Sequence, residues 1–254
     1  MYYMLGIVFP IYNENDIIKQ SILKTIKYCK DIDYFICVVE HYDDTSESIL
    51  DINIPNVHHI KLPRTKLLQE RMNGSLVGYK WLVENKNCDV ITDIDVDLSQ
   101  NIRQLTEGYD LIKDFGIDCV IMSRYIIGSK SNRNFIRDFS SKFIAFNCNL
   151  LTGWKYNIKD WSHTYRFYSS RAIEKILNVG VILEPGVMPM IILLNLLQNN
   201  LKVKEIPTVF IERGRISNVK ISKYMFYYYF NLLKGFIIYY NEQNYKKLAL
   251  RNTK

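Results

Sequence analysis

The stretch Thr92-Asp-Ile-Asp-Val-Asp97 decides how the chain is organised, and it follows an apolar run. If a strand continues through it, Asp93, Asp95 and Asp97 all lie on one face, because side chains alternate along a strand. Three carboxylates this close repel one another unless they are solvated, protonated or bridged by a cation, most commonly a hard divalent ion. The alternative is a strand that runs into solvent and ends in aspartates that cap a helix. The stretch alone is compatible with both.

Strands and helices alternate on either side of this stretch. We expect strands over 5–9, 34–40, 57–62, 89–95 and 119–122, and helices over 15–29, 67–83 and 102–115. This alternation predicts an α/β fold with an open, mostly parallel sheet and helices on both faces. Ligands bind such sheets at the carboxyl ends of the strands, where the loops 10–14, 40–45 and 95–99 fall. The motifs GxGxxG and GxxxxGK[ST] do not occur, so neither a conventional dinucleotide fold nor a P-loop is supported.

Composition describes an ordinary globular protein with a basic end. The chain has 254 residues, of which 48% are hydrophobic, and a formal net charge of +7. From residue 201 onward there are 11 Lys and Arg against three Asp and Glu, so the rest of the chain is close to neutral. A basic end suits a membrane, a nucleic acid or a phosphorylated ligand, although 246–254 alone reads as a solvated tail.

The cysteines and histidines suggest no metal site of their own. The five cysteines form no CxxC pair, which indicates buried, reduced thiols. The four histidines form no ligand pattern, so we expect surface or satisfied roles for the isolated His41 and His163.

Residues 220–242 predict an amphipathic helix with a very broad apolar face rich in tyrosine. Such a helix either packs onto the domain or lies in a membrane interface. We therefore divide the chain into a domain over 1–218 and a C-terminal helix and tail over 219–254.

The N-terminus lacks a signal-peptide pattern and no run of 18 apolar residues occurs, which predicts a cytoplasmic protein at the periphery of a membrane. Nucleic-acid binding is disfavoured, because the tyrosines accompany an apolar face rather than a basic groove, and no obligate protein partner is evident.

Six short motifs occur in a characteristic order. They are 9–14 (Phe-Pro-Ile-Tyr-Asn-Glu), 95–99 (Asp-Val-Asp-Leu-Ser), 123–125 (Ser-Arg-Tyr), Arg137 with Ser141, 160–166 (Asp-Trp-Ser-His-Thr-Tyr-Arg) and 206–213 (Ile-Pro-Thr-Val-Phe-Ile-Glu-Arg). Their order resembles that of the family 2 glycosyltransferases of the GT-A fold, most closely the dolichol-phosphate mannose synthase type. The corresponding family patterns are P-x-Y-N-E, D-A-D-L-S, S-R-Y, R-x-x-x-S, D-x-T-S-x-F-R and V-P-I-x-F-x-x-R. The resemblance extends over about 6–238.

The resemblance implies a Rossmann-like GT-A domain that binds a nucleotide-sugar donor. Asp95 and Asp97 would hold a Mg²⁺ or Mn²⁺ ion against the donor diphosphate. The implied nucleotide-binding residues are Pro10, Tyr12, Glu14, Glu40 and Asp95. The implied catalytic residues are Asp95, Asp97, Arg124 and Arg213, and the implied phosphate- or acceptor-binding residues are Arg124, Arg137, Ser141 and Arg213.

The activity implied is that of an inverting hexosyltransferase, which moves a sugar from a GDP- or UDP-sugar to a polyprenyl or dolichyl phosphate. A lipid phosphate is already anionic near neutral pH, so positioning and electrostatics suffice without a strong base. One alternative is metal-dependent transfer to a glycan or protein hydroxyl, which requires a general base. Another is a non-catalytic sugar-nucleotide-binding protein, because 39–45 lacks both glycines of the family's V-D-D-G-S-x-D-G-T.

Two acidic residues depart from the family pattern. Asp93 has no counterpart in it, and we expect a structural or supporting role. Glu184 stands two places earlier than the acidic residue of the family's G-F-x-F-Q-x-E, which makes it a weak site candidate.

Overall fold

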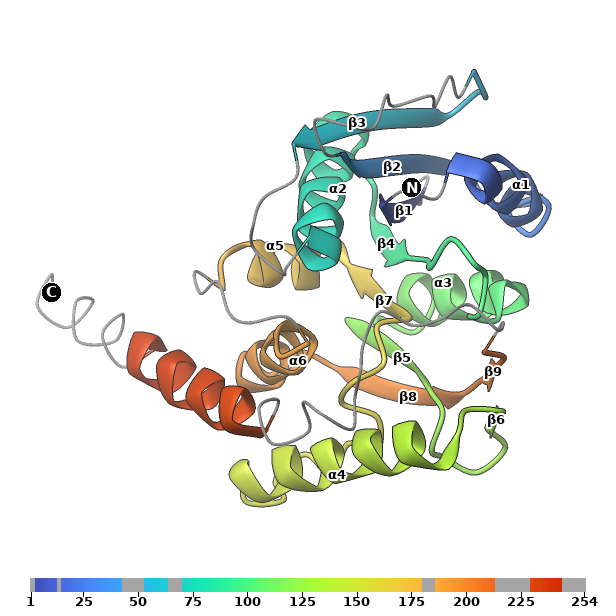
Figure 1. The fold of residues 1–254 in the computed structure, drawn as a ribbon. Coiled ribbons are helices and arrows are strands. Elements are labelled where there is room, and N and C mark those ends of the chain that lie inside the picture. Colours follow the sequence, from blue (N-terminus) through green and yellow to red (C-terminus); the bar gives the residue numbers. More distant parts are fainter. Residues whose placement is uncertain are drawn as a thin grey trace, which may run out of the picture.

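The computed structural model describes residues 3–12, 15–42, 53–63, 70–179, 186–212 and 229–243. A seven-stranded sheet in the order β3-β2-β1-β4-β7-β5-β8 forms its centre (Figure 1). These strands are β1 (Leu5–Tyr12), β2 (Tyr34–Tyr42), β3 (Val57–Pro63), β4 (Val90–Asp93), β5 (Cys119–Ser123), β7 (Arg166–Ser169) and β8 (Val203–Pro207). A separate two-stranded sheet joins β6 (Lys130–Ser131) to β9 (Val209–Phe210).

Helices cover both faces of the large sheet, as the alternating pattern predicted. They are α1 (Asn15–Ile26), α2 (Glu70–Lys86), α3 (Leu105–Lys113) after the short 3-10 helix η1 (Ile102–Gln104), α4 (Phe135–Leu151), α5 (Ser170–Leu177) and α6 (Met188–Gln198). Residues 229–243 form a further helix, called the C-terminal helix below. Figure 1 shows α1 and α3 on one face and α2, α5 and α6 on the other, with α4 beyond the β8 edge.

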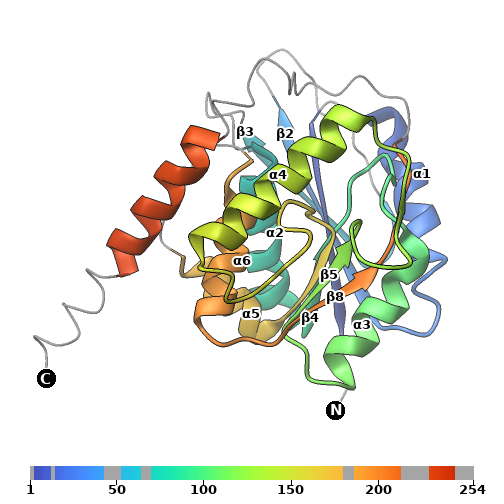
Figure 2. The same cartoon turned by 90° about the horizontal axis from the view of Figure 1, so that it is seen from below.

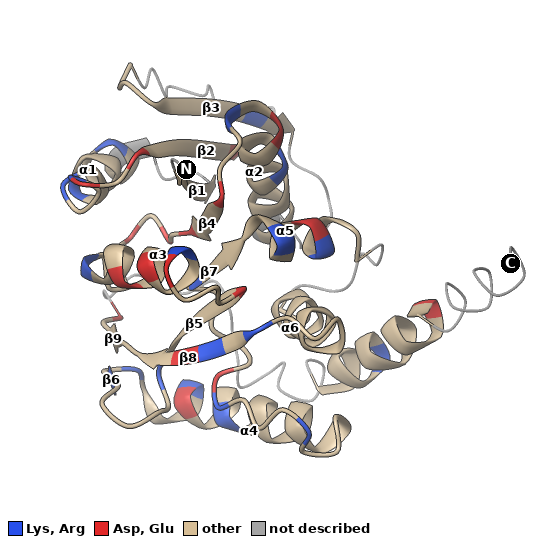
Figure 3. Cartoon of the chain, turned by 180° about the vertical axis from the view of Figure 1, so that it is seen from behind, with Lys and Arg blue, Asp and Glu red and all other residues tan. Residues whose placement is uncertain are grey.

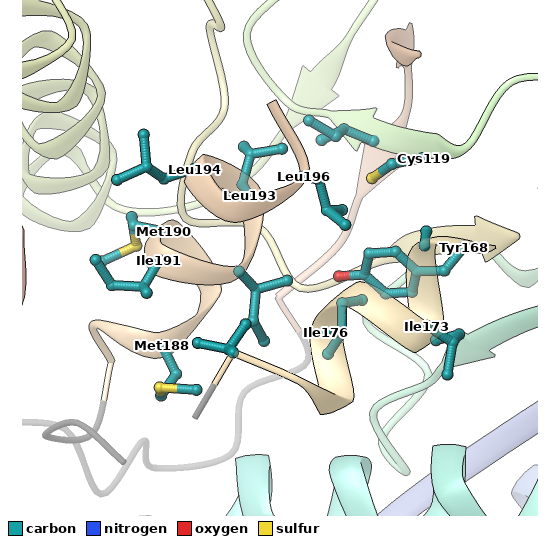
Figure 4. Packing of buried hydrophobic residues seen from close by; sticks show 14 of the residues in the cluster. Cys119, Tyr168, Ile173, Ile176, Met188, Met190, Ile191, Leu193, Leu194 and Leu196 are labelled. Atoms are coloured by element: carbon teal, nitrogen blue, oxygen red, sulfur yellow. The ribbon is translucent and has the colours of Figure 1, made fainter. Parts of the chain in front are cut away.

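Each face of the sheet has its own apolar core. Under α5 and α6, Tyr168 and Cys119 meet the inward side chains of an almost wholly apolar helix (Figure 4). Under α1 and α3, Ile18, Ile22 and Leu105 are fully buried in a second cluster. Burial on both faces explains why the central strands read as continuous apolar runs.

One strand of the sheet does not follow the predicted alternation. β7 is antiparallel to both neighbours, β4 and β5, whereas the other pairings of the sheet are parallel. A four-residue strand carries too little pattern to be recognised, and its two partners are distant in sequence. α3 packs closely against it: a Cβ added at Gly108 would lie 2.4 Å from the Phe167 ring.

The first strand is longer than predicted and continues through Pro10 to Tyr12. β4 pairs with β1 only as far as Val8, while β2 accompanies β1 to its end. Pro10 therefore lies where one edge of β1 has no strand partner among the described residues, and a proline without an N–H is tolerated there.

The C-terminal helix packs onto the body and also exposes apolar side chains. Leu232, Phe236 and Tyr239 are buried, and the Tyr239 hydroxyl donates to Asn195 Oδ1 of α6 at 3.0 Å. Its outer side exposes Phe230 and other apolar residues, and Figure 3 shows few charges on it. The first part of the predicted helix, 220–228, and the proposed domain boundary at 218 lie outside the described residues.

Two further expectations are met within the described part of the chain. The five cysteines are buried and unpaired. No helix there is both long and apolar enough to cross a bilayer.

Candidate functional site

The aspartate stretch leaves the sheet earlier than predicted. β4 ends at Asp93, and the chain then turns, with the Leu98 N–H donating to the Asp95 carbonyl at 2.9 Å. Leu98 has a φ of +52°, a left-handed conformation that is strained for a side chain of this kind. Ser21 Oγ of α1 donates to the Val96 carbonyl at 2.5 Å and anchors the turn. The prediction that all three aspartates share one strand face is therefore wrong.

Asp93 is separated from the other two aspartates. Its carboxylate is buried and accepts hydrogen bonds from Ser75 Oγ at 3.1 Å and from the Tyr79 hydroxyl at 2.9 Å, both on α2. These bonds tie α2 to the end of β4, which agrees with the structural role expected for Asp93.

Local hydrogen bonds orient the carboxylates of Asp95 and Asp97. Gln100 makes two hydrogen bonds with Asp95: its Nε2 donates to Oδ2 at 3.2 Å, and its Oε1 accepts from the Asp95 N–H at 3.0 Å. The Ser99 N–H donates to Asp97 Oδ1 at 2.9 Å, an Asx turn. Both side chains are partly exposed at the edge of the sheet, so they are accessible to a ligand.

The donor atoms present at this edge suit Mg²⁺ or Mn²⁺ bound together with a substrate. Within the described ranges, no group of three or more His, Cys, Asp or Glu side chains converges to hold an ion. Asp95 and Asp97 would thus supply carboxylate oxygens, and ligand oxygens and water would complete the shell. This is how Mg²⁺ is usually held in proteins that bind phosphate esters. The chemistry of the donor set fits the predicted ion.

Three of the predicted nucleotide-binding residues lie at the same edge. Pro10 and Tyr12 belong to the last part of β1, and Glu40 stands beside Ile11 near the end of β2. The Glu40 carboxylate is buried and lies 2.9 Å from His59 Nε2 of β3. Of the other two, Asp95 belongs to the aspartate turn and Glu14 lies outside the described residues.

Arg124 forms a buried ion pair at the end of β5. Its Nε and Nη2 donate to the two carboxylate oxygens of Asp160 at 2.8 Å each, and its backbone N–H donates to Asp160 Oδ2 at 3.0 Å. Burial alone would raise the pKa of Asp160, but the Arg124 guanidinium outweighs it and holds that pKa well below its usual range. Ser162 Oγ accepts a further bond from Arg124 at 3.0 Å. The motifs 123–125 and 160–166 thus meet through this pair.

Arg137 and Ser141, predicted together as phosphate- or acceptor-binding residues, have different partners in the structure. Arg137 makes an ion pair with Glu212, and Ser141 Oγ instead accepts from Arg133 Nη1 at 2.9 Å. Sequence reasoning missed Arg133, although it lies in the loop after the fifth strand, where ligands of such sheets bind. Arg213 lies outside the described residues.

His163 does not have the surface or satisfied role that was expected. It is 4% exposed, with Nδ1 2.5 Å from the Met122 carbonyl, and its Nε2 has no hydrogen-bond partner among the described residues. Burial, followed by the nearby Arg124 charge, lowers its pKa to about 3, so the imidazole is neutral. Its isolation in the sequence concealed this position.

Comparisons with known proteins agree with this architecture. In a scan of protein-family models, residues 6–177 match glycosyl transferase family 2. A sequence search of curated proteins found no match. Among solved structures, glucosyl-3-phosphoglycerate synthase from Mycobacterium tuberculosis in complex with Mn²⁺, UDP and phosphoglyceric acid has a TM-score of 0.57 and 12% identity, over 84% of this chain and 72% of that chain. The same enzyme with Mg²⁺ and UDP has a TM-score of 0.55 and 13% identity, over 84% and 73%.

At these identities the structural likeness concerns the fold alone, and it is the GT-A fold that the motifs implied. Neither the family match nor these two structures shows the dolichol-phosphate mannose synthase subtype. The family match spans more than half of the chain and includes the aspartate turn, Arg124 and Ser141. The chain is therefore a glycosyltransferase and belongs to glycosyl transferase family 2.

Proposed function

We propose that this enzyme moves a sugar from a GDP- or UDP-sugar to a polyprenyl or dolichyl phosphate at a membrane surface, with inversion at the anomeric carbon. Residues 1–218 would form the catalytic domain. Residues 219–254 would assist a peripheral attachment to the cytoplasmic side of a membrane.

On the donor side, the proposal rests on the edge formed by β1, β2 and the aspartate turn. Asp95 and Asp97 would hold Mg²⁺ or Mn²⁺, which when bound neutralises charge on the diphosphate leaving group. Gln100 and Ser99 keep the two carboxylates oriented before the donor arrives, which lowers the cost of ordering them. Tyr12 and Glu40 would contact the nucleoside. The complexes of the mycobacterial enzyme with UDP and Mn²⁺ or Mg²⁺ support this donor chemistry.

On the acceptor side, one observation carries the proposal: the outer face of α4 is an exposed apolar stripe. The stripe consists of Phe135, Ile136, Phe139, Phe143, Phe146 and Leu150. At about 100° per residue, these side chains lie within roughly 100° of the helix circumference. Neighbouring rings along the stripe are stacked, with centroids 6.2 Å apart for Phe135 and Phe139. Exposed apolar areas of this extent mark contacts with proteins, lipids or apolar ligands.

The stripe adjoins both the cationic end of α4 and the C-terminal helix. It starts two residues after Arg133, and Phe143 contacts the ring of Tyr229 at 5.9 Å between centroids. Figure 2 shows the long α4 and the C-terminal helix on the same side of the molecule. A long apolar chain with a phosphate head matches this combination of an apolar face and positive charge. A small soluble acceptor does not account for the exposed apolar face of α4.

The reaction requires no general base if the acceptor is a phosphate. An acceptor phosphate oxygen attacks the anomeric carbon from the side opposite the diphosphate, and the nucleoside diphosphate leaves with the bonding electrons. Because that oxygen is already an anion, the enzyme's task is to align it and to balance the accumulated negative charge. Arg213 and Arg124, which also pairs with Asp160, are proposed for that balance.

A second acceptor class is favoured by one specific observation. The neutral His163 has a buried Nε2 with no hydrogen-bond partner in the described part of the chain, and an imidazole in this form accepts a hydrogen bond from a hydroxyl. Transfer to a glycan or protein hydroxyl is therefore the alternative to be tested.

The test is a matrix of donors and acceptors. Purified protein with Mn²⁺ is incubated with UDP- and GDP-sugars and with citronellyl phosphate, phosphoglyceric acid or a sugar hydroxyl acceptor, and the products are identified by mass spectrometry. We expect transfer to citronellyl phosphate. Transfer only to a hydroxyl acceptor, or binding of donor without transfer to any acceptor, would overturn the proposal.

Membrane attachment is tested separately by co-sedimentation with anionic vesicles. Phe139→Glu places a charge in the middle of the stripe and is expected to reduce binding several-fold, because it removes apolar contact and repels the surface. Phe115→Glu is the matched control, since Phe115 follows α3, is not part of the stripe and is 69% exposed, against 51% for Phe139. Equal binding by the two variants would argue against α4 as the contact surface.

A further inference from the structure

The segment 124–142 contains five positive side chains, and their partners differ. Arg124 is paired with Asp160, Arg137 with Glu212 and Lys142 with Asp138. Lys130 is exposed to solvent. Arg133 is half-buried, and no carboxylate of the described residues lies within ion-pair distance of it.

The contacts of the Arg133 guanidinium are with neutral oxygens. Nη1 donates to the Tyr125 hydroxyl at 3.2 Å and to Ser141 Oγ at 2.9 Å. These two hydroxyls hold the guanidinium in place without neutralising it. Burial, followed by the adjacent Arg124 charge, lowers the pKa of Arg133. A half-buried cation whose contacts are with neutral oxygens is stabilised by an anion that arrives from outside.

The position of Arg133 relates it to the reaction. Its loop is tied to the segment after β9 by two bonds between the Asn132 side chain and the Glu212 backbone, with the Glu212 N–H donating to Asn132 Oδ1 at 2.6 Å. The same segment is bonded to the aspartate turn, because the Ile211 N–H donates to the Ser99 carbonyl at 3.0 Å. Arg133 thus belongs to the same rim of the molecule as the proposed donor site.

We propose that Arg133, assisted by the hydroxyls of Tyr125 and Ser141, binds the phosphate group of the acceptor. A forked guanidinium beside two hydroxyl donors matches the several oxygens of a phosphate monoester. Arg137, whose charge is satisfied by Glu212, positions α4 against β9 instead of binding the ligand. The identification of this phosphate as the acceptor's rests on the proposed function, whereas the anion site itself does not.

The test is calorimetric titration in the absence of divalent metal, with inorganic phosphate and with citronellyl phosphate as probes. Wild type is compared with Arg133→Gln, Arg133→Lys and the matched control Lys130→Gln, in which an exposed lysine of the same loop loses its charge. We expect Arg133→Gln to lower the affinity for both probes by about tenfold to a hundredfold, because one charge-assisted contact is lost. Arg133→Lys keeps the charge but not the fork, so its affinity should be intermediate, and Lys130→Gln should stay within about twofold of wild type.

The outcomes separate the anion site from the proposed function. If Arg133→Gln binds both probes as tightly as wild type, or if wild type binds neither, the anion site is refuted. If Arg133 governs phosphate binding but the enzyme transfers sugar only to hydroxyl acceptors, the site stands and the lipid-phosphate function fails. If transfer to citronellyl phosphate occurs with an unchanged KM in Arg133→Gln, the function stands and Arg133 is not its phosphate-binding residue. Thermal melting of each variant identifies any loss of binding that is due to unfolding.

Discussion

The substitution Asp160→Asn tests whether the Arg124 ion pair organises the acceptor side of the site. Asp160 is fully buried and accepts four hydrogen bonds, three from Arg124 and one from the His163 N–H at 3.1 Å. Two of the four reach each carboxylate oxygen. Asparagine has the same shape, but one of its two terminal atoms is an NH₂ group. In either orientation of the amide, its NH₂ group therefore faces two hydrogen-bond donors.

The expected cost follows from that geometry. Two bonds to a charged or backbone donor are lost, and the Arg124 guanidinium stays buried without a counter-charge. Breaking a buried ion pair from one side costs about 3–5 kcal/mol. For a chain of this size, each kcal/mol lowers the Tm by roughly 2–4 °C, so we expect a decrease of about 6–20 °C.

Thermal unfolding at neutral pH measures this effect, and Asp138→Asn is the control. Asp138 pairs with Lys142 at 2.7 Å, but that lysine is 59% exposed, and exposed pairs contribute below about 1 kcal/mol. A decrease below about 2 °C for Asp160→Asn, or an equal decrease for both variants, would refute the reasoning.

The pH dependence of the Tm difference between wild type and Asp160→Asn tests independently the direction of the Asp160 pKa shift. The pKa of Asp160 in the folded protein is well below its ordinary value, because of Arg124. The ion pair therefore makes its full contribution to the free energy of unfolding above the ordinary carboxyl pKa. This contribution is lost as the pH falls below that value toward the pKa of Asp160 in the folded protein. The difference in Tm between wild type and Asp160→Asn should be constant from about pH 5 to 7 and should shrink below about pH 4.

Three further predictions follow from single features of the structure. Asp97→Asn should abolish the Mn²⁺-dependent thermal shift caused by nucleotide donors while the Tm without ligand stays unchanged; a retained shift would exclude a metal role. Gly108→Ala should lower the Tm by several degrees, because the new Cβ meets the Phe167 ring at 2.4 Å and overpacking costs about 1–3 kcal/mol; Thr106→Ala, exposed on the same helix, should not. The five cysteines should resist alkylation at pH 8 until the protein unfolds, since burial raises the pKa of four of them to about 12, and rapid labelling of native protein in mass spectra would contradict this.

Much of the fold was predictable because its signals are local. Apolar runs separated by helical spacing identified the parallel strands, and both faces carry helices as expected. β7 was not predictable, because a four-residue strand placed between β4 and β5 depends on partners far away in sequence. The end of β1 was misjudged because Pro10 normally interrupts a sheet, whereas here the neighbouring strand has already ended.

The candidate site was predictable where a residue acts with its sequence neighbours and not where its partner is distant. Asp95 and Asp97 are oriented by Ser99 and Gln100 of the same turn, so the motif contains the residues that orient them. The partner of Arg137 is Glu212, which is distant in sequence, and no spacing within the motif reveals it. His163 was overlooked for the same reason, since its surroundings come from β5 and β9.

The two residues that follow β9 connect these two sides of the site. The Ile211 N–H donates to the Ser99 carbonyl beside the aspartate turn, and Glu212 bonds through its backbone to the Asn132 side chain and through its carboxylate to the Arg137 guanidinium. Two consecutive residues thus join the donor-side turn to the acceptor-side loop and helix. Because Arg137 is paired within this junction while the contacts of Arg133 are with neutral hydroxyls, the junction favours Arg133 over the motif arginine as the proposed phosphate-binding residue.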